Sequence, residues 1–243
     1  MATNVTGTTG DSCGSSSTVA IVGATGDLGF GLALRLAQAG VPVVIGSRDA
    51  ARAAEAAERV QEAVPGANVR GLANPEAASA AEVVVLSVPF ATQASTLRSI
   101  RPALTPGTVL LDVTVPLATA VGGRPTRTLI VSQGSAAQQA QELVPEGVSV
   151  VSGLHTVAAK HLAQLEHPLD EDALLCSDDR VAKQRIAALL GRIPGLRPVD
   201  AGRLESSRIV EQITALTIGI NIRHKATAGL KLTGLPPSGS FDA

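Results

Sequence analysis

The stretch Val19-Ala-Ile-Val-Gly23-Ala-Thr-Gly26-Asp-Leu-Gly29-Phe-Gly31 decides the fold of this chain. A short apolar run ends in a cluster of glycines, and a periodic apolar segment begins directly after them. This order predicts a strand, a tight turn and a helix. Glycines at 23, 26 and 29 permit the turn, a close approach of phosphate to the backbone and close packing of helix on strand. The helix N-terminus favours an anion. We predict that the turn binds the pyrophosphate of a dinucleotide; the alternative is a tight turn without a ligand.

Alternation of strand and helix patterns continues along the chain. Strands are expected at 18–22, 41–46, 68–72, 82–88, 108–112, 148–151, 173–176 and 196–199, and a loop is expected at 113–132. Continuous Val and Leu runs are typical of strands buried on both faces of a parallel sheet. The pattern predicts an α/β fold with a Rossmann-type doubly wound parallel sheet. We expect a disordered tail at 1–17, a dinucleotide-binding Rossmann domain at 18–153 and a small C-terminal α/β domain at 154–243.

Composition narrows the class of function. The 243 residues are 45% hydrophobic and carry a net charge of −1, so we expect a large core and neither nucleic acid nor a membrane as partner. The chain has no Tyr, which excludes enzymes that need a catalytic tyrosine. Its two cysteines and four histidines have no metal-binding spacing, so no metal is expected. No apolar run is long enough to span a membrane, and no signal peptide is recognisable. A reducing cytoplasm is the expected location.

The end of the second strand selects the dinucleotide. NAD sites usually carry an acidic residue about 20 residues past the glycines, where it bonds the ribose 2′-OH. Here the strand ends in Ser47 and Arg48, and Arg52 follows one helical turn later. A hydroxyl and two guanidinium groups can bind a 2′-phosphate, so NADP is favoured. The alternative is that both arginines are solvated surface charges.

Other candidate residues also follow strands, at the sheet edge where doubly wound folds bind ligands. Ser87, Val88 and Pro89 end the fourth strand and are expected to border the nicotinamide. His155 follows the sixth strand, where it is either a catalytic or a structural residue. The long apolar helix expected at 206–222 is either a homodimer contact or a buried core helix.

The chain resembles the NADPH-dependent reductases of the deazaflavin coenzyme F420. The segments that carry the resemblance are the glycine turn, Ile45-Gly-Ser-Arg48, Ser87-Val-Pro-Phe90, Gly153-Leu-His-Thr156, Gly195-Leu-Arg-Pro-Val-Asp-Ala-Gly202 and Glu205-Ser-Ser-Arg-Ile-Val-Glu211. The resemblance implies a deazaflavin cleft that the C-terminal domain completes. It also implies reversible hydride transfer between C4 of the nicotinamide and C5 of the deazaflavin.

The resemblance further implies roles for single residues. Those that would hold the pyrophosphate are Thr25, Gly26, Asp27 and Leu28, in the turn framed by Gly23 and Gly29. The 2′-phosphate would be bound by Ser47, Arg48 and Arg52. The nicotinamide would lie beside Ser87, Val88, Pro89 and Ala159. The hydride-transfer site would be bordered by His155 and Thr214. The acidic deazaflavin tail is expected toward solvent or near arginines such as Arg208. The partners are then two small molecules, NADP and coenzyme F420. Two alternatives stay open: an NADPH-dependent reductase of another acceptor, such as an imine or a flavin, and a non-catalytic NADP-binding redox sensor.

Overall fold

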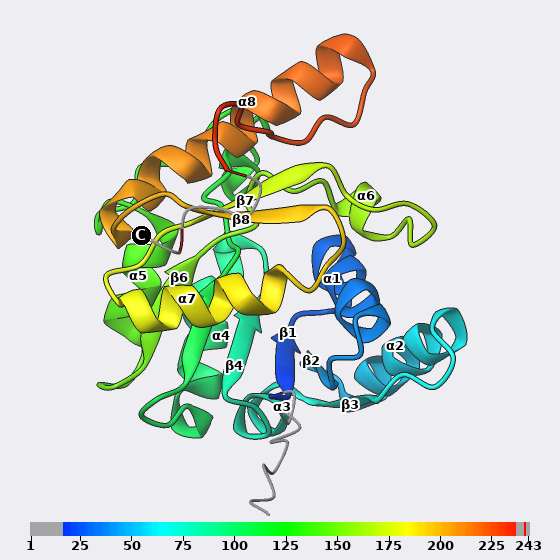
Figure 1. Cartoon of the computed structure of the whole chain (residues 1–243). Helices are drawn as coiled ribbons and strands as arrows, with labels where there is room; N and C mark the ends of the chain where they lie inside the picture. Colours follow the sequence, from blue (N-terminus) through cyan, green and yellow to red (C-terminus); the bar gives the residue numbers. More distant parts are fainter. Residues whose placement is uncertain (1–16, 237–240, 242–243) are drawn as a thin grey trace, which may run out of the picture.

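A computed structural model describes residues 17–236 and residue 241 of the chain (Figure 1). Six parallel strands form the main sheet, in the order β3-β2-β1-β4-β5-β6. They are β1 (Val19–Val22), β2 (Val43–Ser47), β3 (Val69–Ala73), β4 (Val83–Leu86), β5 (Val109–Asp112) and β6 (Ser149–Ser152). Two βαβ halves that run outward from the centre give this order, so the predicted doubly wound sheet is confirmed. Apart from residue 17, the tail predicted at 1–17 lies outside the described residues.

The strand order reverses between β1 and β4, at the centre of the sheet. Val22, the last residue of β1, is in register with Gly46 of β2 and Leu86 of β4. The N–H of Gly23 donates to the carbonyl of Gly46 (3.0 Å), and the N–H of Ser87 donates to the carbonyl of Val22 (2.9 Å). The glycine turn therefore lies between the end of β2 and the end of β4. Loops diverge at such a point and leave a crevice for a ligand.

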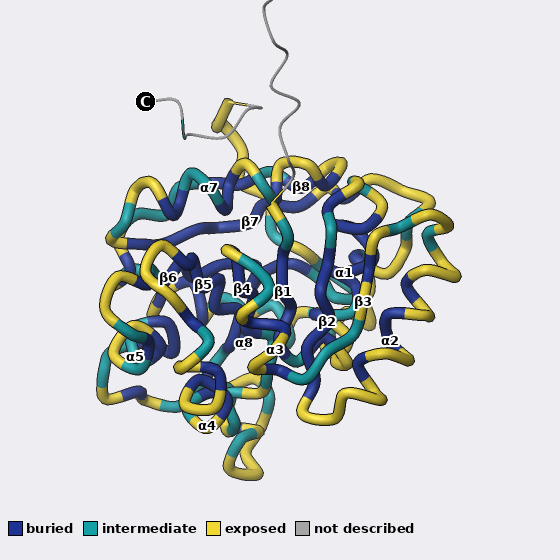
Figure 2. The backbone as a smooth tube through the Cα atoms, turned by 90° about the horizontal axis from the view of Figure 1, so that it is seen from below, coloured by how far each residue is buried: buried dark blue, intermediate teal, exposed yellow. Residues whose placement is uncertain are grey.

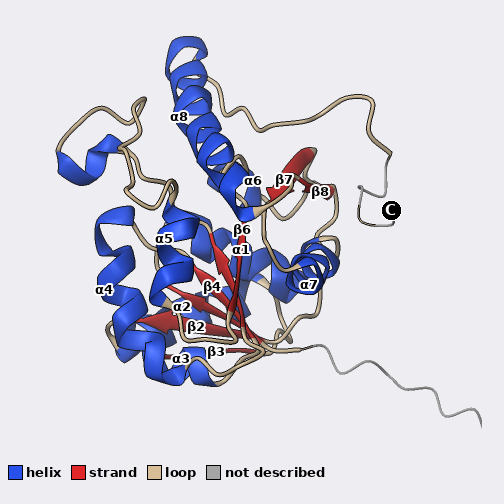
Figure 3. Ribbon diagram, turned by 90° about the vertical axis from the view of Figure 1, so that its left-hand side faces the viewer, coloured by secondary structure: helices blue, strands red, loops and turns tan. Residues whose placement is uncertain are grey.

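Helices cover both faces of the sheet (Figure 3). On one face are α1 (Asp27–Gln38), α2 (Ala50–Ala63) and α7 (Arg180–Leu190), and on the other are α3 (Asn74–Ser79), α4 (Phe90–Ile100) and α5 (Ala136–Leu143). Strand side chains alternate between the two cores, as a pleated strand requires. Val19 and Ile21 belong to the first core, and Ala20 and Val22 to the second. The central strands are buried, while the outer faces of the helices are exposed (Figure 2).

The chain after β6 adds a smaller layer. The short helix α6 (Ala159–Leu162) leads to β7 (Glu171–Leu175) and β8 (Leu196–Asp200), which form a two-stranded parallel sheet. An antiparallel bridge between Ser152 and Cys176 connects this layer to the end of β6. The division of the chain at residue 153 stays a prediction.

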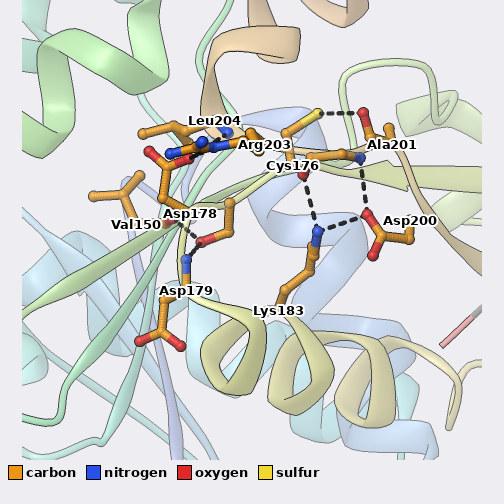
Figure 4. A network of polar contacts seen from close by, with 11 residues as sticks. Val150, Cys176, Asp178, Asp179, Lys183, Asp200, Ala201, Arg203 and Leu204 are labelled. Atoms are coloured by element: carbon orange, nitrogen blue, oxygen red, sulfur yellow. Dashed lines mark hydrogen bonds and ion pairs between the residues drawn. The ribbon is translucent and has the colours of Figure 1, made fainter. Parts of the chain in front are cut away.

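A buried lysine ties α7 to the end of β8 (Figure 4). The ammonium group of Lys183 donates to the carboxylate of Asp200 (2.6 Å) and to the carbonyl of Gly202 (2.9 Å). The side chain is 8% exposed, so these two acceptors offset the cost of removing the charge from water. The crossover between β7 and β8 is thereby fixed to the sheet that it connects.

The first half of the last helix, α8 (Ser207–His224), packs on the rest of the molecule, and its second half extends away from it (Figure 1). Its buried residues are Ser207, Val210, Glu211 and Ala215. Leu216 and Ile222 are each 63% exposed, so the alternative of a buried core helix is wrong, while the homodimer contact stays a prediction. Within the part of the chain that the structure describes, no helix is long and apolar enough to cross a membrane.

Most predicted elements are present, with boundaries that shift by a few residues. The strand expected at 82–88 ends at Leu86. The N–H of Ser87 still donates to β1, but Pro89 has no N–H with which to continue the pairing. The segment expected as loop at 113–132 contains a 3₁₀ helix at Ala118–Val121. A bridge between Leu117 and Thr128 closes it. A short 3₁₀ helix and a single bridge produce no repeating pattern of apolar side chains, so the sequence does not reveal them.

Candidate functional site

The glycine turn lies so close to β4 that two of its positions exclude a side chain. Gly23 has a φ of +83°, which favours glycine. A Cβ on Gly23 would also lie 2.6 Å from Cγ1 of Val88. A Cβ on Gly29 would lie 2.8 Å from Cα of Ala24 and 3.0 Å from the hydroxyl oxygen of Ser87. The structure therefore brings Ser87 and Val88 against the turn. That they border a nicotinamide stays a prediction.

The first turn of α1 is open to solvent. Thr25, Gly26 and Asp27 are exposed, and Leu28 is half-buried. Gly26 is the N-cap residue and supplies no side-chain cap. The first N–H groups of a helix have no acceptor within the helix itself, so they can bind an anion. The Asp27 carboxylate opposes an anion at the same turn, which favours a backbone role for this residue.

The end of β2 carries two exposed cationic side chains and one buried hydroxyl. Arg48 and Arg52 are exposed, and Ser47 is buried. The Ser47 hydroxyl accepts a hydrogen bond from the N–H of Asp49 (3.3 Å). The Asp49 carboxylate accepts from the N–H of Ala51 (2.9 Å) and caps α2. The acidic residue nearest to a ribose 2′-OH position is thus engaged in capping, and the remaining groups suit a phosphate.

The His155 side chain is buried, and among the described residues neither ring nitrogen has a hydrogen bond of ordinary length and angle. Burial lowers the pKa of His155 to about 4, against a smaller opposing effect of the Thr114 backbone, so the ring is neutral at pH 7. It follows Leu154, whose φ of +64° is strained for a non-glycine residue. Buried polar groups without partners are rare, and this one fits a site where a ligand supplies the missing contact.

Thr214 lies directly beside this loop. Its hydroxyl donates to the backbone carbonyl of His155 (2.8 Å), which connects α8 to the chain after β6. The structure therefore brings together the two residues expected at the hydride-transfer site. Ala159 lies at the start of α6, where its carbonyl faces Gly31 of α1. Pro89 is exposed beside Val88.

A cavity of about 350 Å³ opens between α8 and the segment after β5. Its walls are Pro116, Thr128, Leu129, Ile130, Val131, Gly134, Arg208, Glu211 and Gln212. Arg208 gives this mostly apolar space one cationic side chain. The segment 128–131 had been expected only as loop, so sequence reasoning missed this wall.

A buried polar network behind the cavity was also missed. The side-chain amide of Gln93 donates to the Asp112 carboxylate (2.7 Å), to the Thr114 hydroxyl (2.7 Å) and to the carbonyl of Ala136 (3.0 Å). The Asp112 carboxylate also accepts from the N–H of Thr114 (3.0 Å). The one sequence signal was an acidic residue at the carboxyl end of a continuous apolar strand.

Glu211 connects α8 to the same network. Its two carboxylate oxygens accept from the N–H groups of Ala136 (3.0 Å) and Ala137 (3.2 Å), at the start of α5. Burial raises the pKa of Glu211 to about 8, with a further contribution from the charge of Asp112. Burial likewise raises the pKa of Asp112 to about 6. Two carboxyl groups at such proximity disfavour a second negative charge.

Comparison with known proteins identifies close relatives. The chain matches the family model described as NADP oxidoreductase, coenzyme F420-dependent, over residues 18–116. It is 43% identical over 222 residues to the F420-dependent NADP reductase of Methanothermobacter thermautotrophicus, across 90% of this chain and 95% of that protein. Identity to the F420-dependent NADP reductase of Methanocaldococcus jannaschii is 41% over 222 residues, across 89% and 98%. A crystal structure from Arthrobacter sp. FB24, provisionally assigned as an F420-dependent NADP-reductase, matches with a TM-score of 0.76 at 25% identity, across 89% and 99%.

The raised pKa of Glu211 predicts a pH dependence of stability. The unfolded chain loses this proton near the ordinary value of 4.5, whereas the native protein keeps it until about pH 8. The free energy of unfolding should therefore fall as pH rises through this window, by on the order of a few kcal/mol. Glu211→Gln removes the titrating group and should flatten this part of the profile. Urea unfolding at pH 5, 7 and 9 measures the difference.

Glu205→Gln is the matched control, because Glu205 is exposed and lies just before α8. Its profile should follow that of the wild type. Identical slopes for Glu211→Gln and the wild type would refute the assignment of the pH dependence to Glu211.

Proposed function

The chain belongs to the family of coenzyme F420-dependent NADP oxidoreductases, and we propose that it transfers a hydride reversibly between NADP(H) and the deazaflavin coenzyme F420. The observation that carries this function is the match to F420-dependent NADP reductases along nine-tenths of the chain. The open first turn of α1 and the cations after β2 support NADP as one of the two partners.

We assign the dinucleotide to the crevice at the centre of the sheet. The backbone of residues 25–28 binds the pyrophosphate, framed by the two glycines that allow the turn to approach β4. Ser47, Arg48 and Arg52 bind the 2′-phosphate, since charged donors suit its oxygens better than a carboxylate would. The nicotinamide then extends past Ser87, Val88 and Pro89 toward Ala159.

The residues around His155 position the reacting rings rather than move protons. When bound, the two cofactors supply the hydride donor and acceptor themselves. A neutral, buried imidazole contributes an uncharged hydrogen-bonding group and excludes water. The Thr214 hydroxyl holds α8 against the His155 loop and is already engaged. Such fixed geometry is what a transfer between two bound rings requires.

The assay that tests this function mixes the protein anaerobically with NADPH and oxidised F420. We expect loss of NADPH absorbance with F420 and none with flavin mononucleotide alone. Equal or faster reaction with flavin mononucleotide would favour a reductase of another acceptor. No reaction with any acceptor, while NADPH still binds, would favour a redox sensor.

His155→Ala in the same assay separates a role at the reacting rings from a structural one. We expect lower turnover together with unchanged affinity for NADPH. Unchanged turnover with a lower melting temperature would make His155 structural.

Arg48→Glu tests the 2′-phosphate site. The substitution places a negative charge where the phosphate binds, so the apparent constant for NADPH should rise about tenfold or more, which corresponds to at least ~1.4 kcal/mol. The constant for NADH, which lacks the phosphate, should change little. Equal effects on both would contradict the assignment.

A second copy of this chain is the partner that we propose for α8. Exposed apolar side chains occur along the helix, at Ile209, Leu216, Ile220 and Ile222, and on the segment that lines a cavity with it, at Ile130. Gatherings of exposed apolar side chains are typical of protein interfaces. The buried free thiol of Cys176 is compatible with the reducing cytoplasm that we propose as its compartment.

Light scattering measures the oligomeric state. We expect the mass of two chains for the wild type and of one chain for Leu216→Glu, because a charge at the centre of the patch opposes its burial. Val181→Glu, the same kind of change at an exposed apolar position of α7, should leave the dimer intact. A wild-type protein with the mass of one chain would refute this interface.

A further inference from the structure

We propose that Arg35 is a positioning residue that fixes α6, and with it the nicotinamide side of the cleft, to the helix that binds the pyrophosphate. This inference rests on the proposed function, since it needs the dinucleotide to bind at α1. It assigns a role in cofactor binding to a side chain that lies outside the crevice.

Arg35 is a buried cation that is satisfied by backbone carbonyl groups alone. It lies on α1 and is 2% exposed. Its guanidinium donates to four carbonyl oxygens, those of Leu162 (3.0 Å), His167 (2.9 Å), His161 (2.8 Å) and Gln164. Among the described residues, no carboxylate forms an ion pair with it. Burying such a charge is costly unless its donors are used, so these bonds strongly favour one placement of the segment 161–167.

Close packing adds to the hydrogen bonds. Gly31 lies one turn before Arg35 on α1, on the side that faces α6. A Cβ on Gly31 would lie 2.8 Å from Cβ of Leu162 and 3.3 Å from the carbonyl oxygen of Ala159. Leu162 itself is fully buried. The two helices therefore contact each other through backbone and Cβ atoms, and the interface has no space for a side chain at position 31.

Glu171 holds the other end of the short helix. One carboxylate oxygen accepts from the N–H of Ala158 (2.9 Å), and the other lies 2.5 Å from Nδ1 of His161. The backbone of Gly229 covers this carboxylate, since a Cβ there would overlap it. α6 has four residues and cannot stabilise its own position. Arg35 and Glu171 do so from the two sides.

Through this arrangement, α1 sets the distance between the pyrophosphate end and the nicotinamide end of the proposed dinucleotide site. Its N-terminus binds the pyrophosphate, and Arg35 sets where α6 lies relative to that same helix. Ala159, the first residue of α6, belongs to the proposed nicotinamide wall. Loss of Arg35 should therefore loosen the nicotinamide end of the site while the phosphate contacts at α1 and β2 remain.

The test compares two ligands that share every phosphate and differ in the nicotinamide. Calorimetry gives the affinities of NADP⁺ and of 2′-phospho-ADP-ribose for the wild type, Arg35→Met and Arg35→Lys. The nicotinamide contacts then weaken while the phosphate contacts remain, so we expect Arg35→Met to lower the affinity for NADP⁺ by about tenfold. The affinity for 2′-phospho-ADP-ribose should stay within about twofold of the wild type. Arg35→Lys should fall between, because an ammonium keeps the charge but lacks the planar fork of donors.

Two further variants control for general damage. Arg192→Met removes a guanidinium that donates to the carbonyl of Ala39 (2.7 Å) at the far end of α1, so both affinities should stay unchanged. Gly31→Ala keeps Arg35 and pushes α6 outward, and it should weaken NADP⁺ selectively. It also carries the test if Arg35→Met does not fold.

Equal weakening of both ligands by Arg35→Met or Gly31→Ala would overturn the inference, as would a wild type that binds both ligands equally. Failure of the wild type to bind NADP⁺ at all would instead refute the proposed function.

Discussion

The close approach of the glycine turn to β4 is the constraint on which the rest of the structure depends. Positions 23 and 29 have no room for a Cβ, because Val88, Ala24 and the Ser87 side chain already occupy that space. The turn can take this form only if β1 lies at the centre of the sheet, between β2 and β4. Once it does, the glycine turn, the cations after β2 and the segment after β4 lie at the same edge of the sheet, where doubly wound folds bind ligands.

Buried ionisable groups mark where the C-terminal elements dock on this frame. Arg35 fastens α6 to α1, Lys183 fastens α7 to β8, and Glu211 fastens α8 to α5. Each side chain is nearly or fully removed from water, and in each case backbone groups supply some or all of the hydrogen-bond partners. A buried polar or charged group tolerates little displacement from its hydrogen-bond partners, whereas apolar contacts can slide. Polar contacts therefore fix the register of elements whose apolar contact areas are small.

The sequence predicted what depends on neighbours along the chain and missed what depends on distant ones. The glycine turn, the buried strand runs and the basic end of β2 are local patterns, and the structure has each in place. Arg35 and Glu211 were not recognised, because their partners lie more than a hundred residues away for Arg35 and more than seventy for Glu211. From sequence alone, an arginine in an Ala- and Leu-rich helix is predicted to be a surface charge, because the distant carbonyl groups that it binds are not known. The apolar pattern of α8 was equally ambiguous, since exposure depends on where the helix leaves the body.

Protonation decides what His155 contributes to the proposed reaction. With a pKa of about 4, roughly one imidazole in a thousand carries the extra proton at pH 7. A general acid in that state would be almost entirely in the wrong form, so proton donation is a poor account of its burial. A neutral ring in a dry wall has a different use, because it adds no charge beside a nicotinamide that becomes positive when it gives up a hydride. The Thr214 hydrogen bond then fixes the backbone that carries this ring, and the contribution that we propose for this end of the cleft is geometry rather than acid–base chemistry.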